Sequence, residues 1–240
     1  MPTVEAIDLV ETVTNAYESI ASALQRIDDA RRAATTVTLT VAPYFSARWL
    51  TPRLGRLWHE HPEIDLRLHH AYEPVDFQVD NVDLGVVWGT GRWPSANAVK
   101  VLDGGLIAVC NPAIRQQLGD PVDLTELAKF SLLYEFDAEH WRRWLEVAGL
   151  GRERDLSFRR IDDSHALRTA VIEGHGVGLF ARSLLDEELA QGSLVAVGDH
   201  LVGDSHYYLT VPATRAMRPA VATVADWILA RSVFGGFVAS

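Results

Sequence analysis

The chain has 240 residues, 48% hydrophobic and 22% charged, which is typical of a globular protein with a large core in one or two domains. The formal net charge of −10 argues against a broad nucleic-acid-binding surface, which would need clustered lysines and arginines. With one cysteine, no apolar run long enough for a membrane span and no signal-peptide layout at the start, we expect a cytoplasmic protein without an internal disulfide.

Residues 3–33 are predicted to form a long helix with a heptad repeat. Apolar residues recur at alternating spacings of three and four, which is the spacing of a coiled-coil seam. The seam positions are Ala6, Leu9, Val13, Ala16, Ile20, Ala23 and Ile27. The pattern predicts either a helix that pairs between subunits or an amphipathic helix that packs on its own domain.

Residues 37–68 are predicted to form a strand, a helix and a second strand parallel to the first. Apolar side chains alternate with threonines from Val37 to Val41, as in a β-strand, and Ser46 is predicted to cap the helix. A helix between two strands requires a parallel pairing. The N-terminus of this helix, at residues 44–46, is therefore directed at the carboxyl end of a strand, where open α/β sheets bind ligands.

This stretch resembles a known protein family. Residues 43–54 and 61–68 are similar to the opening of the effector-binding domain of LysR-type transcriptional regulators, and the Trp-Leu-x-Pro-Arg-Leu sequence is similar to the branch that contains the glycine-cleavage activator. The similarity continues to about residue 229. It implies an α/β, two-lobed, periplasmic-binding-protein-like (type 2) fold with a central cleft, preceded by a long linker helix that pairs between subunits.

The resemblance also implies a division of the chain. Residues 1–35 would be the linker and dimerisation helix, residues 36–101 with 210–240 would form lobe I, and residues 102–209 would form lobe II. The family's winged helix-turn-helix is not in this sequence, so we expect DNA binding only through a DNA-binding domain that the chain lacks.

In the first lobe, Val75 to Asp80 are predicted to form a short helix, and residues 83–91 a buried strand that runs into a glycine-rich turn. In the second lobe, Cys110 lies in an apolar strand and is interpreted as a buried, unreactive thiol. Gly149 is predicted to end a helix that begins near Asp137. The Gly-x-Gly-x-Gly spacing from Gly174 follows a helix rather than a strand, so it does not match a dinucleotide-binding motif, and no cofactor is expected.

The candidate ligand site is the cleft between the lobes. Five candidate residues come from lobe I: Tyr44, Phe45, Ser46, Trp88 and Gly89. Five more come from lobe II: Tyr134, Phe136, Ser164, His165 and Phe180. The resemblance implies effector contacts at these places, although each serine is also an ordinary helix cap and each aromatic residue also suits a core.

The chemistry of these residues predicts a carboxylate or an aromatic effector. Ser46 and Ser164 combine a hydroxyl with backbone donors at a helix start, which can hold a carboxylate without a basic side chain. The aromatic residues favour an apolar body on the ligand. Trp88 stands where relatives usually carry a basic residue. The spacing of the nine histidines does not suit a metal site, and His165 with its acidic neighbours has poor geometry for a catalytic triad.

We therefore expect a cytoplasmic sensor domain that forms a homodimer or a higher homo-oligomer and binds a small metabolite between two lobes, with no catalytic residues, metal or membrane partner. The alternative is a free-standing relative that has been recruited as an enzyme acting on a metabolite bound in the same cleft. Turnover of a bound compound would distinguish the two hypotheses.

Overall fold

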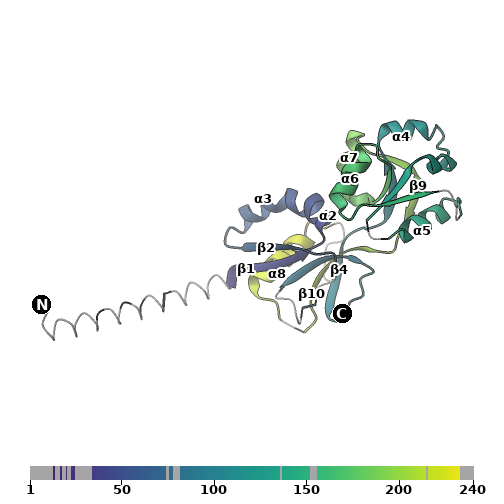
Figure 1. Cartoon of the computed structure of the whole chain (residues 1–240). Coiled ribbons are helices and arrows are strands. Elements are labelled where there is room, and N and C mark those ends of the chain that lie inside the picture. The colour runs from purple at the N-terminus through teal and green to yellow at the C-terminus, as the bar shows by residue number, and fades with distance from the viewer. Residues whose placement is uncertain are drawn as a thin grey trace, which may run out of the picture.

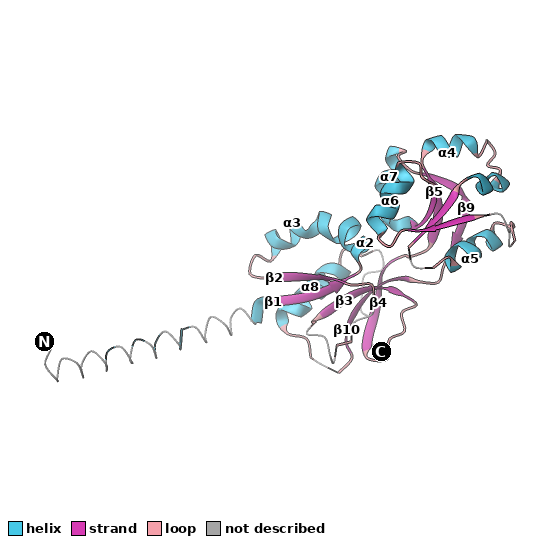
Figure 2. Ribbon diagram, in the orientation of Figure 1, coloured by secondary structure: helices cyan, strands magenta, loops and turns pink. Residues whose placement is uncertain are grey.

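The computed structural model describes residues 34–73, 76–77, 82–135, 137–151, 156–214 and 216–232, together with residues 13, 17, 20, 23 and 24. The two predicted lobes are present, and each is built around a five-stranded mixed sheet (Figures 1 and 2). The fold expectation is thus confirmed. The predicted heptad seam and the short helix at residues 75–80 lie mostly outside the described residues.

Lobe I contains the sheet with strand order β2-β1-β3-β10-β4. β1 is parallel to β2 and β3, as the strand–helix–strand prediction required, whereas β10 is antiparallel to both of its neighbours. The elements of this lobe are β1 (Thr36–Val41), α2 (Pro43–Phe45), η1 (Ser46–Leu50), α3 (Thr51–Glu60), β2 (Asp65–His70), β3 (Leu84–Gly89), β4 (Ala96–Leu102), β10 (His206–Pro212) and α8 (Pro219–Leu229).

The helix after β1 starts earlier than the sequence pattern predicted. Pro43 occupies its first turn, where its missing N–H costs nothing, and the chain stays helical through α2, the π-helical segment η1 and α3. Ser46 lies inside this helix, and its N–H donates to the carbonyl of Ala42 at 2.9 Å. The prediction that Ser46 caps the helix was therefore wrong, because a proline at the first position had already set the start.

Lobe II contains the sheet with strand order β7-β6-β8-β5-β9. β6 is parallel to β7 and β8, and β5 is antiparallel to β8 and β9. The elements are β5 (Leu106–Cys110), α4 (Pro112–Gln117), η2 (Leu124–Lys129), β6 (Ser131–Tyr134), α5 (Glu139–Val147), β7 (Ser157–Arg160), α6 (Ser164–Ile172), β8 (Val177–Ala181), η3 (Arg182–Leu184), α7 (Asp186–Gln191) and β9 (Val195–Val202).

Two crossings connect the lobes, one between β4 and β5 and one between β9 and β10. The chain returns to the lobe I sheet at His206, earlier than residue 210. Gly104 in the first crossing lies against the second: a Cβ on this glycine would stand 2.3 Å from the carbonyl oxygen of Ser205 and 2.5 Å from Nε1 of Trp88. The two crossings are therefore packed together tightly enough to require glycine.

The core runs across the boundary between the lobes. One cluster of buried apolar side chains joins lobe I residues such as Leu39 and Phe45 to lobe II residues such as Leu167 and Phe180. A second cluster fills the far side of lobe II around Trp141 and Trp144. None of the helices that the structure describes combines the length and apolar character needed to cross a membrane.

Local predictions in lobe II agree with the structure. Gly149 follows α5 with a φ of 76°, the left-handed conformation that glycine adopts at the end of a helix. Cys110 is fully buried in β5, and this burial raises the pKa of its thiol to about 12, so the thiol stays protonated at neutral pH. Its interpretation as an unreactive core residue is supported.

Candidate functional site: the cleft between the lobes

A cavity of about 120 Å³ lies between the two lobes. Its volume is similar to the roughly 150 Å³ of an engineered protein cavity that binds benzene. From lobe I it is lined by Ala42, Pro43, Tyr44, Tyr72, Trp88 and Tyr207. From lobe II it is lined by Leu106, Leu133, Tyr134, Glu135, Asp137, His140, Trp141, Ser164, Leu167, Leu179, Phe180 and Ala181. The lining is thus mainly aromatic and aliphatic, with a few polar groups.

Half of the residues predicted for the site line this cavity: Tyr44, Trp88, Tyr134, Ser164 and Phe180. Their elements explain the grouping. Tyr44 lies in the first turn of the helix after β1, Tyr134 ends β6, and Ser164 begins α6. These are the carboxyl ends of strands and the starts of helices, which meet at one edge of each sheet and face one another across the cleft.

Four other predicted residues lie outside the cavity lining. Phe45 is buried in the lobe I core, stacked on Trp49 with ring centroids 4.9 Å apart. Ser46 is buried, and its hydroxyl lies 2.9 Å from Nε2 of His70. Gly89 lies against Trp93. The ring of His165 packs against that of Tyr44, with ring centroids 5.8 Å apart. The tenth predicted residue, Phe136, lies outside the described residues.

Glu135 is the most important cleft residue that sequence reasoning missed. Its carboxylate accepts a hydrogen bond from the hydroxyl of Ser164, which lies 2.7 Å from each carboxylate oxygen. It also accepts one from Tyr72, which belongs to lobe I. Partial burial is the main reason that the pKa of Glu135 is raised. The residue directly follows β6, and its place at a strand end was the signal that could have identified it.

Three tyrosine hydroxyls of the cleft, those of Tyr44, Tyr72 and Tyr207, stay protonated at neutral pH. Burial raises the pKa of Tyr44 and Tyr207 well above the usual range, and burial together with Glu135 raises that of Tyr72 to about 12. Tyr44 is only 6% exposed, and its hydroxyl has no hydrogen-bond partner in the part of the chain that the structure describes. A buried hydroxyl without a partner costs about 1–3 kcal/mol, so a ligand that reaches it would bind more tightly.

The opposite wall of the cleft carries a histidine without charge. The ring of His140 in α5 contacts that of Trp88 in β3, with centroids 5.3 Å apart, and so joins the two lobes. Burial lowers the pKa of His140 below its usual value, so the ring is neutral at pH 7. Among the described residues that line the cavity, none is a lysine or an arginine.

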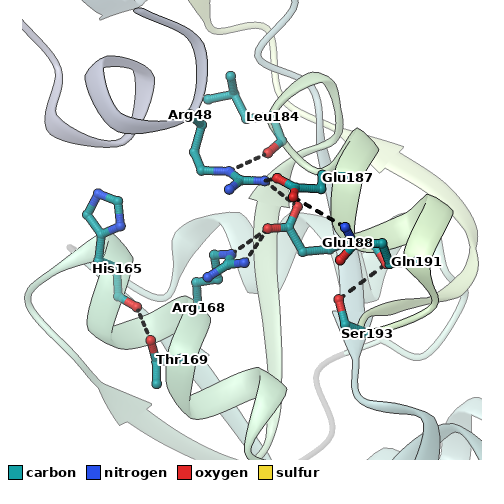
Figure 3. A network of polar contacts seen from close by, with 9 residues as sticks. All are labelled: Arg48, His165, Arg168, Thr169, Leu184, Glu187, Glu188, Gln191 and Ser193. Carbon is teal, nitrogen blue, oxygen red and sulfur yellow. Dashed lines mark hydrogen bonds and ion pairs between the residues drawn. The ribbon is translucent and has the colours of Figure 1, made fainter. Parts of the chain in front are cut away.

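A second polar contact joins the lobes around Glu188 in α7 (Figure 3). Arg48 of lobe I donates from Nη2 to Glu188 Oε2 at 2.6 Å and from Nε to the carbonyl of Leu184 at 3.3 Å. Arg168 of α6 donates from Nε to Glu188 Oε1 at 2.7 Å. The side chain of Glu188 is 2% exposed, so this buried carboxylate is held by two guanidinium groups, one from each lobe.

No group of three or more histidine, cysteine, aspartate or glutamate side chains is arranged to hold a metal ion within the described ranges. Ser164 pairs with the carboxylate of Glu135, but no hydrogen bond joins Ser164 to a histidine among the described residues, so a serine–histidine–carboxylate triad is not formed there. The polar groups that line the cleft are hydroxyls, the carboxylates of Glu135 and Asp137, and the imidazole of His140, which suit binding through hydrogen bonds and charge.

Comparison with known proteins agrees with this architecture. Residues 30–232 match the family model of the LysR substrate binding domain. The chain is 28% identical to the HTH-type transcriptional activator AmpR of Rhodobacter capsulatus, over 97% of this chain and 78% of that protein. It is 30% identical to the glycine cleavage system transcriptional activator of Escherichia coli (strain K12), over 85% and 67%.

Solved structures show the same fold. The effector domain of the transcriptional regulator AmpR of Pseudomonas aeruginosa superposes with a TM-score of 0.72 at 28% identity, covering 81% of this chain and 94% of that one. CrgA, a LysR-type transcriptional regulator from Neisseria meningitidis, superposes with a TM-score of 0.68 at 17% identity, covering 94% and 78%.

Proposed function

Because the chain belongs to the LysR substrate-binding domain family, we propose that it is a sensor domain that binds a small-molecule effector between its lobes and changes their relative angle on binding. Regulators of this family bind small-molecule effectors and typically act as oligomers. The observation that carries the proposal is the cavity between the lobes, with its apolar walls and few convergent polar groups. Such a lining is characteristic of small-molecule sites.

The cavity lining favours an effector with an aromatic or otherwise apolar body. Tyr44, Trp88, Tyr134 and Phe180 provide aromatic surface from both lobes. Burial of apolar surface contributes roughly 25 cal/mol per Å² to the binding free energy. A flat hydrophobic ligand that contacts both walls therefore gains affinity from each of them. A ligand held by both lobes favours one lobe angle over others, because only that angle offers all its contacts.

The proposal includes a homodimer and an action on DNA through another domain. The described helical residues Val13 and Ile20, both predicted seam positions, are 44% and 57% exposed and so offer apolar surface to a second helix. AmpR of Rhodobacter capsulatus is named an HTH-type activator, so control of DNA would pass through a helix-turn-helix domain joined to this one. Such a regulator works beside DNA, and we propose a cytoplasmic location.

The test is a thermal-shift screen of amino acids, small carboxylates, amines and aromatic compounds, followed by calorimetric titration of each hit. A ligand at a hundred times its dissociation constant stabilises the folded state by about 2.7 kcal/mol. Recovery of the hit unchanged would support sensing, and its conversion would support an enzyme.

Two tyrosine variants then locate the site. Tyr134→Ala removes an aromatic wall of the cavity and should weaken binding of the hit about 3- to 10-fold, since aromatic contacts contribute roughly 0.5–1.5 kcal/mol beyond their area. Tyr208→Ala is the matched control, because Tyr208 is also a half-buried strand tyrosine but packs on Trp93 away from the cavity. Equal losses in both variants would contradict binding in this cleft.

A further inference from the structure

The carboxylate of Glu135 lies in the cleft without a positively charged partner. Ser164 and Tyr72 donate hydrogen bonds to it, and it forms no ion pair within the part of the chain that the structure describes. An ionised carboxylate offers about four acceptor positions, whereas these two hydroxyls carry one hydrogen each. About two acceptor positions of Glu135 therefore remain for a ligand.

The charges around Glu135 are also negative. Asp162 and Asp163 lie close enough to raise its pKa, in addition to the larger effect of burial. The nearby guanidinium of Arg160 does not bond to the Glu135 carboxylate in the described structure. Its Nε donates to the backbone carbonyl of Glu135 at 3.0 Å, and its Nη2 donates to Asp162 at 2.9 Å. Since His140 is neutral and no lysine or arginine lines the cavity among the described residues, the charged side chains of the lining are the carboxylates of Glu135 and Asp137, both negative.

Aromatic rings share the cavity with this carboxylate. Tyr72 donates to Glu135 directly, and Tyr44, Trp88 and Tyr134 line the same cavity. The face of an aromatic ring attracts a cation, by about 0.5–2 kcal/mol depending on desolvation. Tyr44 adds a second observation that points to a ligand, because its hydroxyl is buried and unpartnered among the described residues.

We infer that the effector carries a positively charged nitrogen, an amine or a related cation, which binds the carboxylate of Glu135 among the aromatic side chains of the cleft. This inference rests on the proposed function, since it names the charge of that same effector. It replaces the expectation of a carboxylate effector at Ser164: the hydroxyl of that serine already donates to a carboxylate of the protein itself. A second carboxylate at the same place would be repelled.

The test compares three probes that share a phenyl ring and differ in charge: phenethylamine, 2-phenylethanol and 3-phenylpropanoate. Each is titrated calorimetrically into the full chain at neutral pH. We expect phenethylamine to bind at least about 10-fold more tightly than the other two, because a hydrogen bond to a charged group contributes about 1.5–3 kcal/mol. Equal or tighter binding of 3-phenylpropanoate or 2-phenylethanol would overturn the inference while leaving a ligand-binding cleft in place.

Glu135→Gln removes the charge and keeps the shape of the side chain. It should weaken phenethylamine binding about 10- to 100-fold and leave 2-phenylethanol unchanged. The matched control is Glu146→Gln, which makes the same charge change at an exposed position of α5 outside the cavity lining. An amine affinity that stays within about twofold in Glu135→Gln would overturn the inference.

Failure of all three probes also overturns the inference. The outcome of the wider thermal-shift screen then separates the two proposals. If another compound binds and Tyr134→Ala weakens it, the sensor function stands with a different effector chemistry. If no compound binds, the proposed function fails as well.

Discussion

Two glutamates of lobe II, Glu188 and Glu135, face lobe I and have opposite surroundings. Glu188 is buried and held by Arg48 and Arg168, so its charge is balanced within the protein (Figure 3). Glu135 is partly buried and held by hydroxyls alone, so its charge is not balanced. The ion pairs of Glu188 fit a structural role, whereas the lack of a cation at Glu135 fits the binding role that we propose for it.

The difference follows from the elements that surround each residue. Glu188 lies in α7, beside α6 and the helix after β1, which carry arginines on their facing turns. Glu135 lies at the end of β6, where the neighbouring helix start and the loop after β2 supply a serine and a tyrosine. Breaking either set of contacts tests the comparison, and the expected effects decrease from Glu188 to Glu135.

The largest effect is expected for Glu188→Gln. It leaves two guanidinium groups without their shared counter-ion in a site where the carboxylate is 2% exposed, and breaking such a buried pair costs about 3–5 kcal/mol. Urea unfolding measures the loss. Glu187→Gln is the matched control. The Glu187 side chain is 64% exposed, and its Oε2 lies 3.4 Å from Nη2 of Arg48, so the substitution should lower the unfolding free energy by less than about 1 kcal/mol. Equal costs would contradict a structural role for Glu188.

A smaller effect is expected for Arg48→Met, because Glu188 keeps Arg168 as a partner. The substitution removes the long hydrogen bonds to Leu184 and Glu187 and the short one to Glu188, and loss of the short charged bond should dominate, at about 1.5–3 kcal/mol of unfolding free energy. Arg56→Met, at a position that is 70% exposed, should change it by less than about 1 kcal/mol. If Arg48→Met costs no more than this control, the contact between the lobes does not stabilise the fold.

The smallest effect on stability, and one of opposite sign, is expected for Glu135→Gln without ligand. Burial raises the folded pKa of Glu135, so its contribution to stability is full below the unfolded value of about 4.3 and is lost as the pH rises through the folded pKa. Glutamine does not ionise, so the variant does not lose stability as the pH rises through the pKa of Glu135. Its unfolding free energy relative to the wild type should therefore increase from about pH 4 to pH 7.

The gain should stay below about 1 kcal/mol, because water reaches the partly exposed carboxylate and screens its charge. Urea unfolding at both pH values measures it. A variant that is more stable yet binds amines more weakly would mark Glu135 as a residue kept for binding. A relative loss of stability at pH 7 would instead place Glu135 with Glu188 as a structural residue.

Local patterns predicted much of the fold, and half of the predicted site residues line the cavity. Alternation marked β1, whose residues Val37, Leu39 and Val41 are fully buried, and Gly149 marked the end of α5. Tyr44, Tyr134 and Ser164 were found because strand ends and helix starts converge at a cleft in this fold. Ser46 was misplaced because proline and serine both signal helix starts, and the proline came first.

The sequence by itself determined the two-lobed family fold, because alternating strands, helix ends and the Trp-Leu-x-Pro-Arg-Leu stretch are written in neighbouring residues. The charge balance of the cleft was decided only by the tertiary structure. Ser164 reaches Glu135 across 29 residues and Arg48 reaches Glu188 across 140, so no local pattern tells which glutamate finds a cation. Packing of the lobes brings arginines to Glu188 and hydroxyls to Glu135, and this difference separates a structural contact from a proposed binding site.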